Sequence, residues 1–175
     1  LRGPFMQEAV PEGEGAMSAI LGGNRNIIEE VCREIGNVWP ANFNSPGQVV
    51  LSGTRAAVTA AGEKLKALGA KRVIPLAVSA PFHCPLMQPA ADKLAAELEK
   101  IVIKDASIPF ITNVTADYVS SGQEIKKMLV KQVTSPVLWE GLIKKMLADG
   151  IDDFVEVGPG SVLTGLIKKI REVKK

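Results

Sequence analysis

Residues 39–52 read Trp-Pro-Ala-Asn-Phe-Asn-Ser-Pro-Gly-Gln-Val-Val-Leu-Ser. Two segments with β-strand character, 39–44 and 48–52, flank the turn-forming triplet Ser45-Pro46-Gly47. The stretch therefore predicts a hairpin of two adjacent strands. Side-chain hydrogen bonds from Asn42 and Asn44 to the turn backbone account for the amides here, so we assign them no catalytic role.

The segments on both sides of this hairpin extend it into a larger unit. Its further elements are expected at 16–21 (strand), 24–35 (helix), 54–68 (helix) and 71–78 (strand). Asn24 and Thr54 are suited to be N-caps, while Gly36 and Gly69 end the two helices. The order β-α-β-β-α-β is that of a ferredoxin-like unit, in which each helix can cover one face of a four-stranded sheet.

The pattern changes after residue 79. Helices are expected at 87–100, 123–133, 138–148 and 161–171, and strands at 109–115 and 153–157. Two strands make a poor independent sheet, so these two should belong to a larger α/β sheet whose other strands are not in this sequence. The opening Leu1-Arg2-Gly3-Pro4, without an initiator Met, also favours the interpretation that the sequence is a fragment.

Composition excludes several classes of protein. The chain has 175 residues, 46% of them hydrophobic, and a net charge of only +2, which argues against disorder and against nucleic-acid binding. No apolar run is long enough to span a membrane. Cys32 and Cys84 lie far apart and indicate no disulfide framework, so a cytoplasmic location is expected. Neither a cofactor nor a metal site is expected, because no matching motif occurs.

His83 is the only histidine of the chain, so imidazole chemistry must use it. A lone histidine is by default a surface or packed residue. This one follows a predicted strand in a loop between Pro81 and Pro85, which restrict the backbone and suit a side chain aimed at one point. A neutral imidazole can deprotonate a serine hydroxyl and later return the proton.

Two further motifs and one absence bear on the chemistry. Arg2 precedes Gly3, and a planar guanidinium is the best bidentate ligand for a carboxylate. Residues 156–165 are interpreted as a tight strand-to-helix turn, because no Gly-Lys-Ser/Thr of a P-loop follows. No Gly-x-Ser-x-Gly occurs, although a serine acyltransferase on an α/β-hydrolase-like sheet needs that nucleophile elbow.

Taken together, these segments resemble the malonyl-CoA:acyl-carrier-protein transacylases over nearly the whole chain. The matching stretches are Arg2-Gly3 with 5–11 and 15–17, Asn42 to Val50, Ser79-x-Pro81-x-His83-Cys84, 89–94, Asn113, Glu156 to Gly160 and 163–166. Each stretch is weak evidence alone, whereas all of them in this order are specific.

The resemblance implies a ping-pong transfer of malonyl from CoA to the phosphopantetheine thiol of acyl carrier protein, through an acyl-serine. His83 would be the general base and acid, and Arg2 would bind the malonyl carboxylate and so select malonyl over acetyl. The backbone carbonyl of Gln132 would orient the histidine. Phe82 and Asn113 are candidate pocket residues. Malonyl-CoA and acyl carrier protein are the implied partners, without nucleic acid or membrane.

The resemblance also implies two subdomains with the active site between them. Residues 7–78 would form the ferredoxin-like small subdomain, and residues 1–6 and 79–175 the C-terminal part of an α/β-hydrolase-like large subdomain. The serine segment and an oxyanion-hole glutamine of the family are not in this sequence. The chain alone is therefore expected to be inactive, to expose apolar surface and to be marginally stable.

Two alternatives stay open at this point. One is an acyltransferase domain of a polyketide or fatty-acid synthase that uses another acyl group. The other is a non-catalytic ferredoxin-like binding module. RNA binding on such a sheet would need exposed aromatic residues on the strands, for which the first half offers Trp39 and Phe43.

Overall fold

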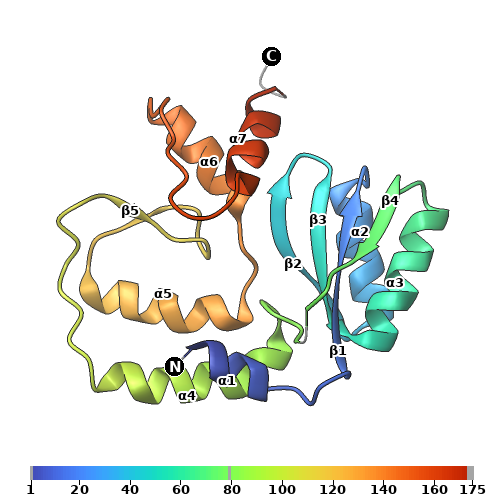
Figure 1. The fold of residues 1–175 in the computed structure, drawn as a ribbon, viewed down its shortest axis with the longest axis horizontal. Coiled ribbons are helices and arrows are strands. Elements are labelled where there is room, and N and C mark those ends of the chain that lie inside the picture. The colour runs from blue at the N-terminus through green and yellow to red at the C-terminus, as the bar shows by residue number, and fades with distance from the viewer. Residues whose placement is uncertain (1, 79, 173–175) are drawn as a thin grey trace.

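The computed structural model describes residues 2–78 and 80–172. A mixed α/β fold results, in which a four-stranded sheet with its helices lies beside a mostly helical part (Figure 1). Ser79 of the histidine-loop motif and residues 173–175 lie outside the described residues.

The two strands of the hairpin and the four elements expected around it are all present. They are β1 (Gly15–Leu21), α2 (Arg25–Ile35), β2 (Val38–Ser45), β3 (Gln48–Thr54), α3 (Arg55–Ala67) and β4 (Arg72–Pro75). The sheet order is β2-β3-β1-β4, and all neighbouring strands are antiparallel. Strand β4 is shorter than the expected 71–78. It ends at Pro75, and the next amide, that of Leu76, still donates to the Met17 carbonyl of β1 at 3.0 Å.

The predicted turn and helix starts are confirmed. Ser45 pairs with Gln48 across the hairpin, and Gly47 takes the positive φ of 74° that glycine adopts most readily. The side chain of Asn24 accepts a hydrogen bond from the Asn26 amide at 2.9 Å, and Thr54 accepts one from Ala57 at 3.4 Å. These caps satisfy amides that the first turn of a helix leaves free.

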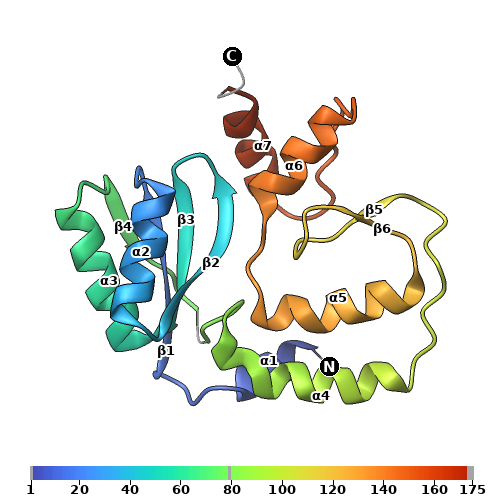
Figure 2. The ribbon, with the colours of Figure 1, turned by 180° about the vertical axis from the view of Figure 1, so that it is seen from behind.

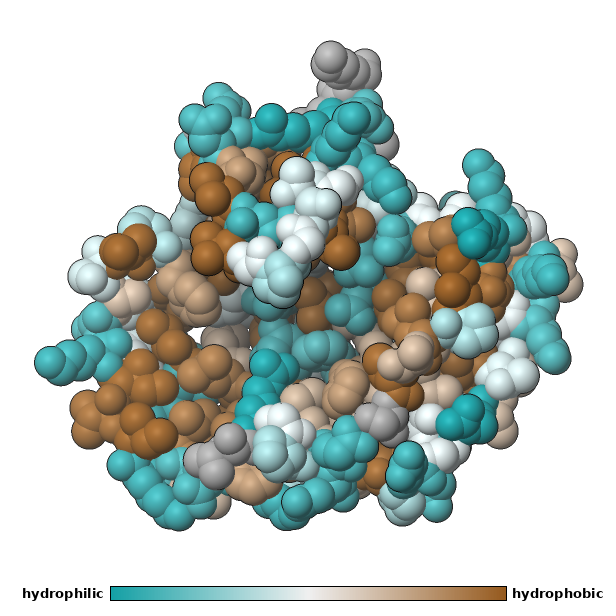
Figure 3. Space-filling view, in the orientation of Figure 1, coloured by the Kyte–Doolittle hydropathy of each residue, from teal (hydrophilic) through white to brown (hydrophobic). Residues whose placement is uncertain are grey.

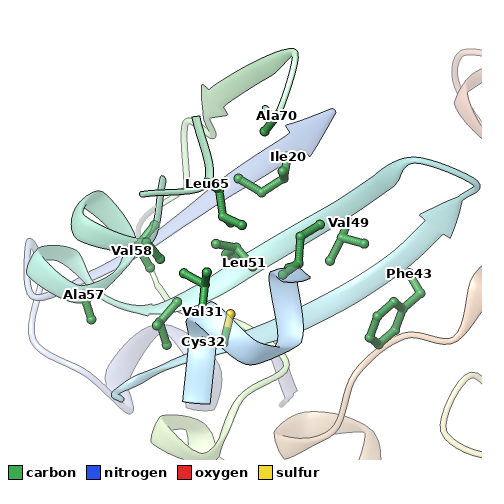
Figure 4. Close-up of a cluster of buried hydrophobic side chains, with 13 residues drawn as sticks. Ile20, Val31, Cys32, Phe43, Val49, Leu51, Ala57, Val58, Leu65 and Ala70 are labelled. Carbon is green, nitrogen blue, oxygen red and sulfur yellow. The ribbon is translucent and has the colours of Figure 1, made fainter. Parts of the chain in front are cut away.

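Both helices cover the same face of the sheet, seen from behind in Figure 2. Because side chains alternate along a strand, Ile20 points toward the helices while Met17 and Ala19 point to the other face. Ile20 and Leu51 are fully buried in the helix-side core of Figure 4. The other face packs against Val78 and Phe82.

The second part consists of short elements grouped in two clusters. They are α1 (Arg2–Glu8), η1 (Pro85–Met87), α4 (Gln88–Glu99), β5 (Phe110–Ile111), β6 (Tyr118–Val119), α5 (Gly122–Thr134), α6 (Trp139–Ala148) and α7 (Val162–Glu172). Helices α1, α4 and α5 pack around Met6, Met87 and Val133. Helices α6 and α7 pack through Leu142, Ile143 and Ile170.

Three features of this part differ from the expectation. Helix α1 was not predicted, because Gly3 and Pro4 are poor helix residues; both lie in its first turn, where Pro is tolerated. The strand expected at 109–115 is only β5, paired with the unpredicted β6. The strand expected at 153–157 is wrong: no strand forms there. A strand exists only where a neighbouring strand takes its backbone hydrogen bonds.

The two parts join along the outer edge of β2. The Phe43 amide donates to the Val137 carbonyl at 2.9 Å, and the Val137 amide donates to the Ala41 carbonyl at 2.8 Å. The free edge of β2 is thereby partly covered by the segment between α5 and α6 (Figure 1). This junction brings the end of α5 next to the sheet unit.

Candidate catalytic site

The His83 loop is a tight turn with a buried anchor. Cys84 is fully buried, and its Sγ donates to the Pro81 carbonyl at 3.1 Å. His83 itself has φ 60°, a left-handed conformation that costs a residue with a Cβ about 1–2 kcal/mol. The surrounding contacts must hold it there, and strain of this kind is typical of functional positions.

One of those contacts joins two residues far apart in sequence. The Nδ1 atom of His83 lies 2.9 Å from the backbone carbonyl oxygen of Gln132, near the end of α5. A carbonyl oxygen can only accept, so Nδ1 carries a proton and donates it. In the neutral ring Nε2 then keeps its lone pair and can accept a proton.

The side chain of Gln132 supports this arrangement. It is buried, and its amide nitrogen donates to the Ser135 carbonyl at 3.3 Å. The same nitrogen lies 3.4 Å from Nδ1 of His83, but two donors cannot bond to each other. The side-chain amide of Gln132 thus lies at the C-terminal end of α5. The last carbonyls of a helix have no partner within the helix, and this amide can donate to a carbonyl there.

Burial lowers the pKa of His83 below its ordinary value of 6.5. The hydrogen bond to the Gln132 carbonyl acts in the opposite direction, because it favours the charged ring. The positive charge of Arg2 lowers the pKa further. The imidazole is therefore neutral near pH 7, which is the state that a general base requires.

Arg2 lies at the first residue of α1 and is exposed. Helix α1 packs on α4, which directly follows the histidine loop, and this places the Arg2 charge where it acts on His83. Within the described chain, no salt bridge involves Arg2. An exposed guanidinium of this kind can bind an anion.

Phe82 and Asn113 line two different hollows, neither of which borders His83. Phe82 is half-buried, packs on both the sheet face and the α1–α4–α5 cluster, and lines a hollow with Arg55 and Val78. Asn113 lines a cavity of about 280 Å³ with Trp139, and its carbonyl accepts a hydrogen bond from the Leu138 amide at 2.8 Å. The structure therefore does not bring these two candidate pocket residues together.

A larger cavity, of about 590 Å³, borders His83. Its walls come from the end of α2, the start of β2 and the segment after α5, with Arg33, Trp39 and Pro136 among the lining residues. Sequence reasoning did not assign these residues to the site. They are distant in the chain, and no local pattern distinguishes them from surface residues.

Cys84, next to His83, does not supply a reactive thiolate. Burial raises the pKa of its thiol, so the sulfur stays protonated, and a thiol reacts only as the thiolate. Its role in the structure is to anchor the loop. In the described residues, no cluster of His, Cys, Asp and Glu could hold a metal ion.

The turn at residues 156–165 also has a structural role. The Glu156 carboxylate accepts hydrogen bonds from the Leu163 amide at 3.1 Å and from the Thr164 amide and hydroxyl at 2.8 and 2.7 Å. These bonds lower the pKa of Glu156, the Thr164 amide most. The carboxylate thus caps α7, where negative charge is favourable.

The structure argues against base stacking on the sheet. Phe43 is only 6% exposed; its ring belongs to the helix-side core and stacks under the Arg25 guanidinium, 3.8 Å from the ring centroid. Trp39 is half-buried and lines the cavity beside His83. One of the two aromatic residues that the RNA-binding alternative requires is therefore unavailable. No helix in the described ranges is long and apolar enough to cross a membrane.

Comparison with known proteins finds a family whose members match this chain. A family model described as acyl transferase domain matches residues 1–174. A malonyl CoA-acyl carrier protein transacylase of Escherichia coli is 51% identical over 173 residues, which cover 97% of this chain and 56% of the relative. The Bacillus subtilis protein of the same name is also 51% identical, over 97% of this chain and 55% of its own.

Solved structures match over the same extent. A malonyl-transacylase in complex with a type II PKS acyl-carrier protein has a TM-score of 0.95 and 48% identity, over 98% of this chain and 56% of that one. An acyl carrier protein S-malonyltransferase from Vibrio cholerae has a TM-score of 0.95 and 46% identity, over 98% of this chain and 57% of that one. The chain spans about half the length of the curated relatives that it matches.

Proposed function

This chain belongs to the acyl transferase domain family, and on that premise we propose that its protein transfers malonyl groups from CoA to acyl carrier protein. The observation that carries the proposal is the hydrogen bond of His83 to the Gln132 carbonyl, together with the nearby charge of Arg2. The names of the relatives supply the substrates.

In the proposed reaction, Nε2 of His83 takes the proton of a serine hydroxyl that is not in this chain. The serine oxygen bonds to the malonyl carbonyl carbon, and the C–S bond to CoA breaks. The CoA sulfur leaves as a thiol with the proton from His83. The phosphopantetheine thiol then gives its proton to His83 and its sulfur attacks the acyl-serine, whose oxygen regains a proton.

The Gln132 carbonyl takes the place of the acidic residue of a Ser-His-Asp triad. It holds Nδ1–H as an aspartate would, but adds no negative charge. Arg2 binds the malonyl carboxylate in a bidentate manner, so that an acetyl group leaves the guanidinium without its partner. Phe82 and Asn113 are proposed to border the acyl pocket only once the rest of the protein encloses them.

The two parts of the fold correspond to two proposed subdomains. The sheet order β2-β3-β1-β4 with both helices on one face supports a ferredoxin-like small subdomain at about residues 7–78. Residues 1–6 and 79–175 are proposed to belong to an α/β-hydrolase-like large subdomain. That α1 continues to Glu8 and packs on α4 supports a boundary close to residue 7.

We propose a cytoplasmic protein whose exposed Lys71 and Arg72, at the start of β4, attract the acidic carrier protein. The free, buried thiols of Cys32 and Cys84 fit a reducing compartment.

A chimera tests the function. This chain replaces the 173 matched residues of the Escherichia coli relative, and malonyl transfer from malonyl-CoA to its carrier protein is measured. We expect activity in the chimera and none in the isolated chain, because the nucleophile is supplied only by the other part. A folded chimera that transfers no malonyl would contradict the proposed function. Turnover by the isolated chain would contradict the expectation that this chain alone is inactive.

Variants of the chimera separate the two roles. His83→Ala should lower kcat/KM roughly 100- to 10,000-fold, the usual contribution of a general base. Arg2→Ala should reduce the preference for malonyl over acetyl about 10- to 100-fold, from ~1.5–3 kcal/mol for a hydrogen bond to a charged group. Lys66→Ala, at an exposed position of α3, is the control and should change neither quantity.

A further inference from the structure

The histidine loop, residues 80–84, rests on the face of the sheet that the helices leave uncovered. Met17, Ala19 and Val50 are buried on this face, and Phe82 of the loop packs against them. Figure 3 looks onto this face and shows apolar residues gathered over the sheet unit. The position of the loop is therefore set by what the strands present to it.

Gly15, the first residue of β1, lets the loop come very close to the sheet. A Cβ at residue 15 would lie 2.2 Å from Cδ and 2.7 Å from Cγ of Pro81, and 3.0 Å from its backbone nitrogen. Carbon atoms that are not bonded to each other pack at about 3.5–4.0 Å. Because the proline ring is closed onto the backbone, it cannot rotate away. Any side chain at residue 15 must therefore push the loop off the sheet.

The backbone of Gly15 does not itself require glycine. The residue lies in a regular strand, paired with Thr54, and is not among the glycines with a positive φ. Glycine in a strand weakens it and often marks a close approach of another backbone. The approach of Pro81, two residues before His83, is the feature that accounts for it.

Ser52 of the neighbouring strand meets the same loop. It pairs with Met17 and so lies on the same face. Its side chain is fully buried, and its hydroxyl has no hydrogen-bond partner within the described part of the chain. Burial raises the pKa of the Cys84 thiol, and the Ser52 hydroxyl acts in the opposite direction, as a donor near the sulfur does. Ser52 therefore lies beside Cys84.

His83 lies between these two anchored residues. Pro81 is seated on Gly15, Cys84 lies beside Ser52, and the Cys84 Sγ closes the turn by donating to the Pro81 carbonyl at 3.1 Å. The turn is thus fixed on both sides of a residue whose left-handed φ of 60° is unfavourable by itself. A loop released from the sheet would relax, and the His83 ring would move away from the Gln132 carbonyl.

We propose that Gly15 and Ser52 are positioning residues, which hold residues 80–84 on the sheet so that Nδ1 of His83 donates to the Gln132 carbonyl. The importance of this geometry for the reaction rests on the proposed function, in which Nε2 is the base. Neither residue needs to touch the substrate. The sheet unit thus contributes to catalysis through the place it gives to the imidazole.

NMR of the single histidine tests the positioning without any enzyme assay. Gly15→Ala should lower the fraction of the Nδ1–H tautomer of His83 at least about twofold, because the displaced ring loses the carbonyl that selects it. Gly62→Ala is the matched control: its Cβ would lie 2.9 Å from Cγ1 of Val73, so it also crowds the sheet unit, but on the helix side. It should leave the tautomer unchanged. An equal loss in both variants would overturn the proposal.

Activity of the chimera with the Escherichia coli relative tests the consequence. Gly15→Ala should lower kcat at least about 10-fold while KM for malonyl-CoA stays within about twofold, since a misplaced base affects the chemical step. The double variant Gly15→Ala, Pro81→Ala lacks the ring carbons that collide and should regain at least about threefold in kcat. Lower activity without this rescue contradicts the proposal. An inactive unsubstituted chimera contradicts the proposed function instead, and the tautomer then decides the positioning.

Ser52→Ala is the milder variant, which keeps the strand pairing and decides the matter if Gly15→Ala does not fold. Removing a buried hydroxyl without a hydrogen-bond partner should not lower stability. We nevertheless expect a lower Nδ1–H fraction and a kcat reduced about threefold. Ser18→Ala, at a buried serine of β1 on the opposite face, is the control and should change neither quantity. An unchanged tautomer and kcat in Ser52→Ala would overturn the proposal.

Discussion

At the scale of single residues, the site depends on the pairing of an imidazole with a carbonyl 49 positions away. The Gln132 carbonyl determines which nitrogen of His83 carries the proton, and burial determines that the ring is neutral. Neither property belongs to histidine as a residue type. Both arise because the loop after β4 and the end of α5 meet at the edge of the sheet unit.

The state of His83 can be measured directly, because the chain has a single histidine whose NMR signals need no assignment. We expect its titration midpoint below 6.5 and an Nδ1–H tautomer at neutral pH. Arg2→Gln should raise the midpoint, since the guanidinium charge disfavours the imidazolium. A midpoint at or above 6.5 would contradict the burial of the ring.

The same shift makes stability depend on pH. The folded pKa is lower than the unfolded one, so below pH 6.5 the unfolded chain binds more protons than the folded chain. The free energy of unfolding should therefore fall as the pH drops from 6.5 toward the folded pKa of His83. The His83→Gln variant lacks this contribution and serves as the control in denaturant titrations.

At the scale of elements, the sheet unit is stabilised by one core on the helix-covered face. Ile20 of β1 belongs to this core and has no exposed surface. Ile27, on the outer side of α2, is 38% exposed. Both are isoleucines of the same unit, which makes them a matched pair for measuring what burial contributes.

Ile20→Ala should lower the free energy of unfolding by about 2–5 kcal/mol, because it removes buried methylene groups and leaves a cavity. Ile27→Ala should cost less than about 1 kcal/mol, since water already reaches that side chain. Urea titrations followed by circular dichroism measure both. Equal effects of the two substitutions would show that the β1–α2–α3 core does not limit stability.

The segment 153–157, unlike the strands of the sheet unit, does not form the strand expected from its sequence. Its residues have strand propensity and alternate correctly, yet no strand forms, because a strand is a property of two segments. The helices around it need no neighbouring segment for their backbone hydrogen bonds, because these bonds are local. Within one chain, therefore, helices could be predicted from sequence more reliably than strands.

At the scale of the whole molecule, the two parts differ in how completely they bury their apolar residues. The sheet unit encloses its core, whereas several large apolar side chains of the second part stay open to water, including Val102 (89%), Val157 (95%) and Val162 (73%). Exposed surface of this kind withholds the burial free energy that a complete domain gains.

The isolated chain should accordingly be less stable than the chimera and should bind a hydrophobic dye. We expect a lower urea midpoint and strong dye fluorescence for the chain alone, and weak fluorescence once the remaining part of the family chain covers this surface. If the isolated chain unfolded cooperatively at the urea midpoint of the chimera and bound no dye, its exposed apolar surface would not be what lowers its stability.

Local patterns in the sequence determined the sheet unit: the alternation around Ile20, the Pro46-Gly47 turn and the cap at Asn24 act over a few residues, so they could be read without coordinates. The helix boundaries could be predicted for the same reason, because helix caps are local. Contacts between distant segments could not be derived from such patterns.

The tertiary structure decided that His83 donates to the Gln132 carbonyl, which the sequence suggested only through the family resemblance. It also decided that Phe43 is buried under Arg25 and that 153–157 has no backbone partner among the described residues. Each of these depends on which segments lie side by side after folding. That outcome is set by the summed burial and hydrogen bonding of the whole chain, and no stretch of sequence carries it by itself.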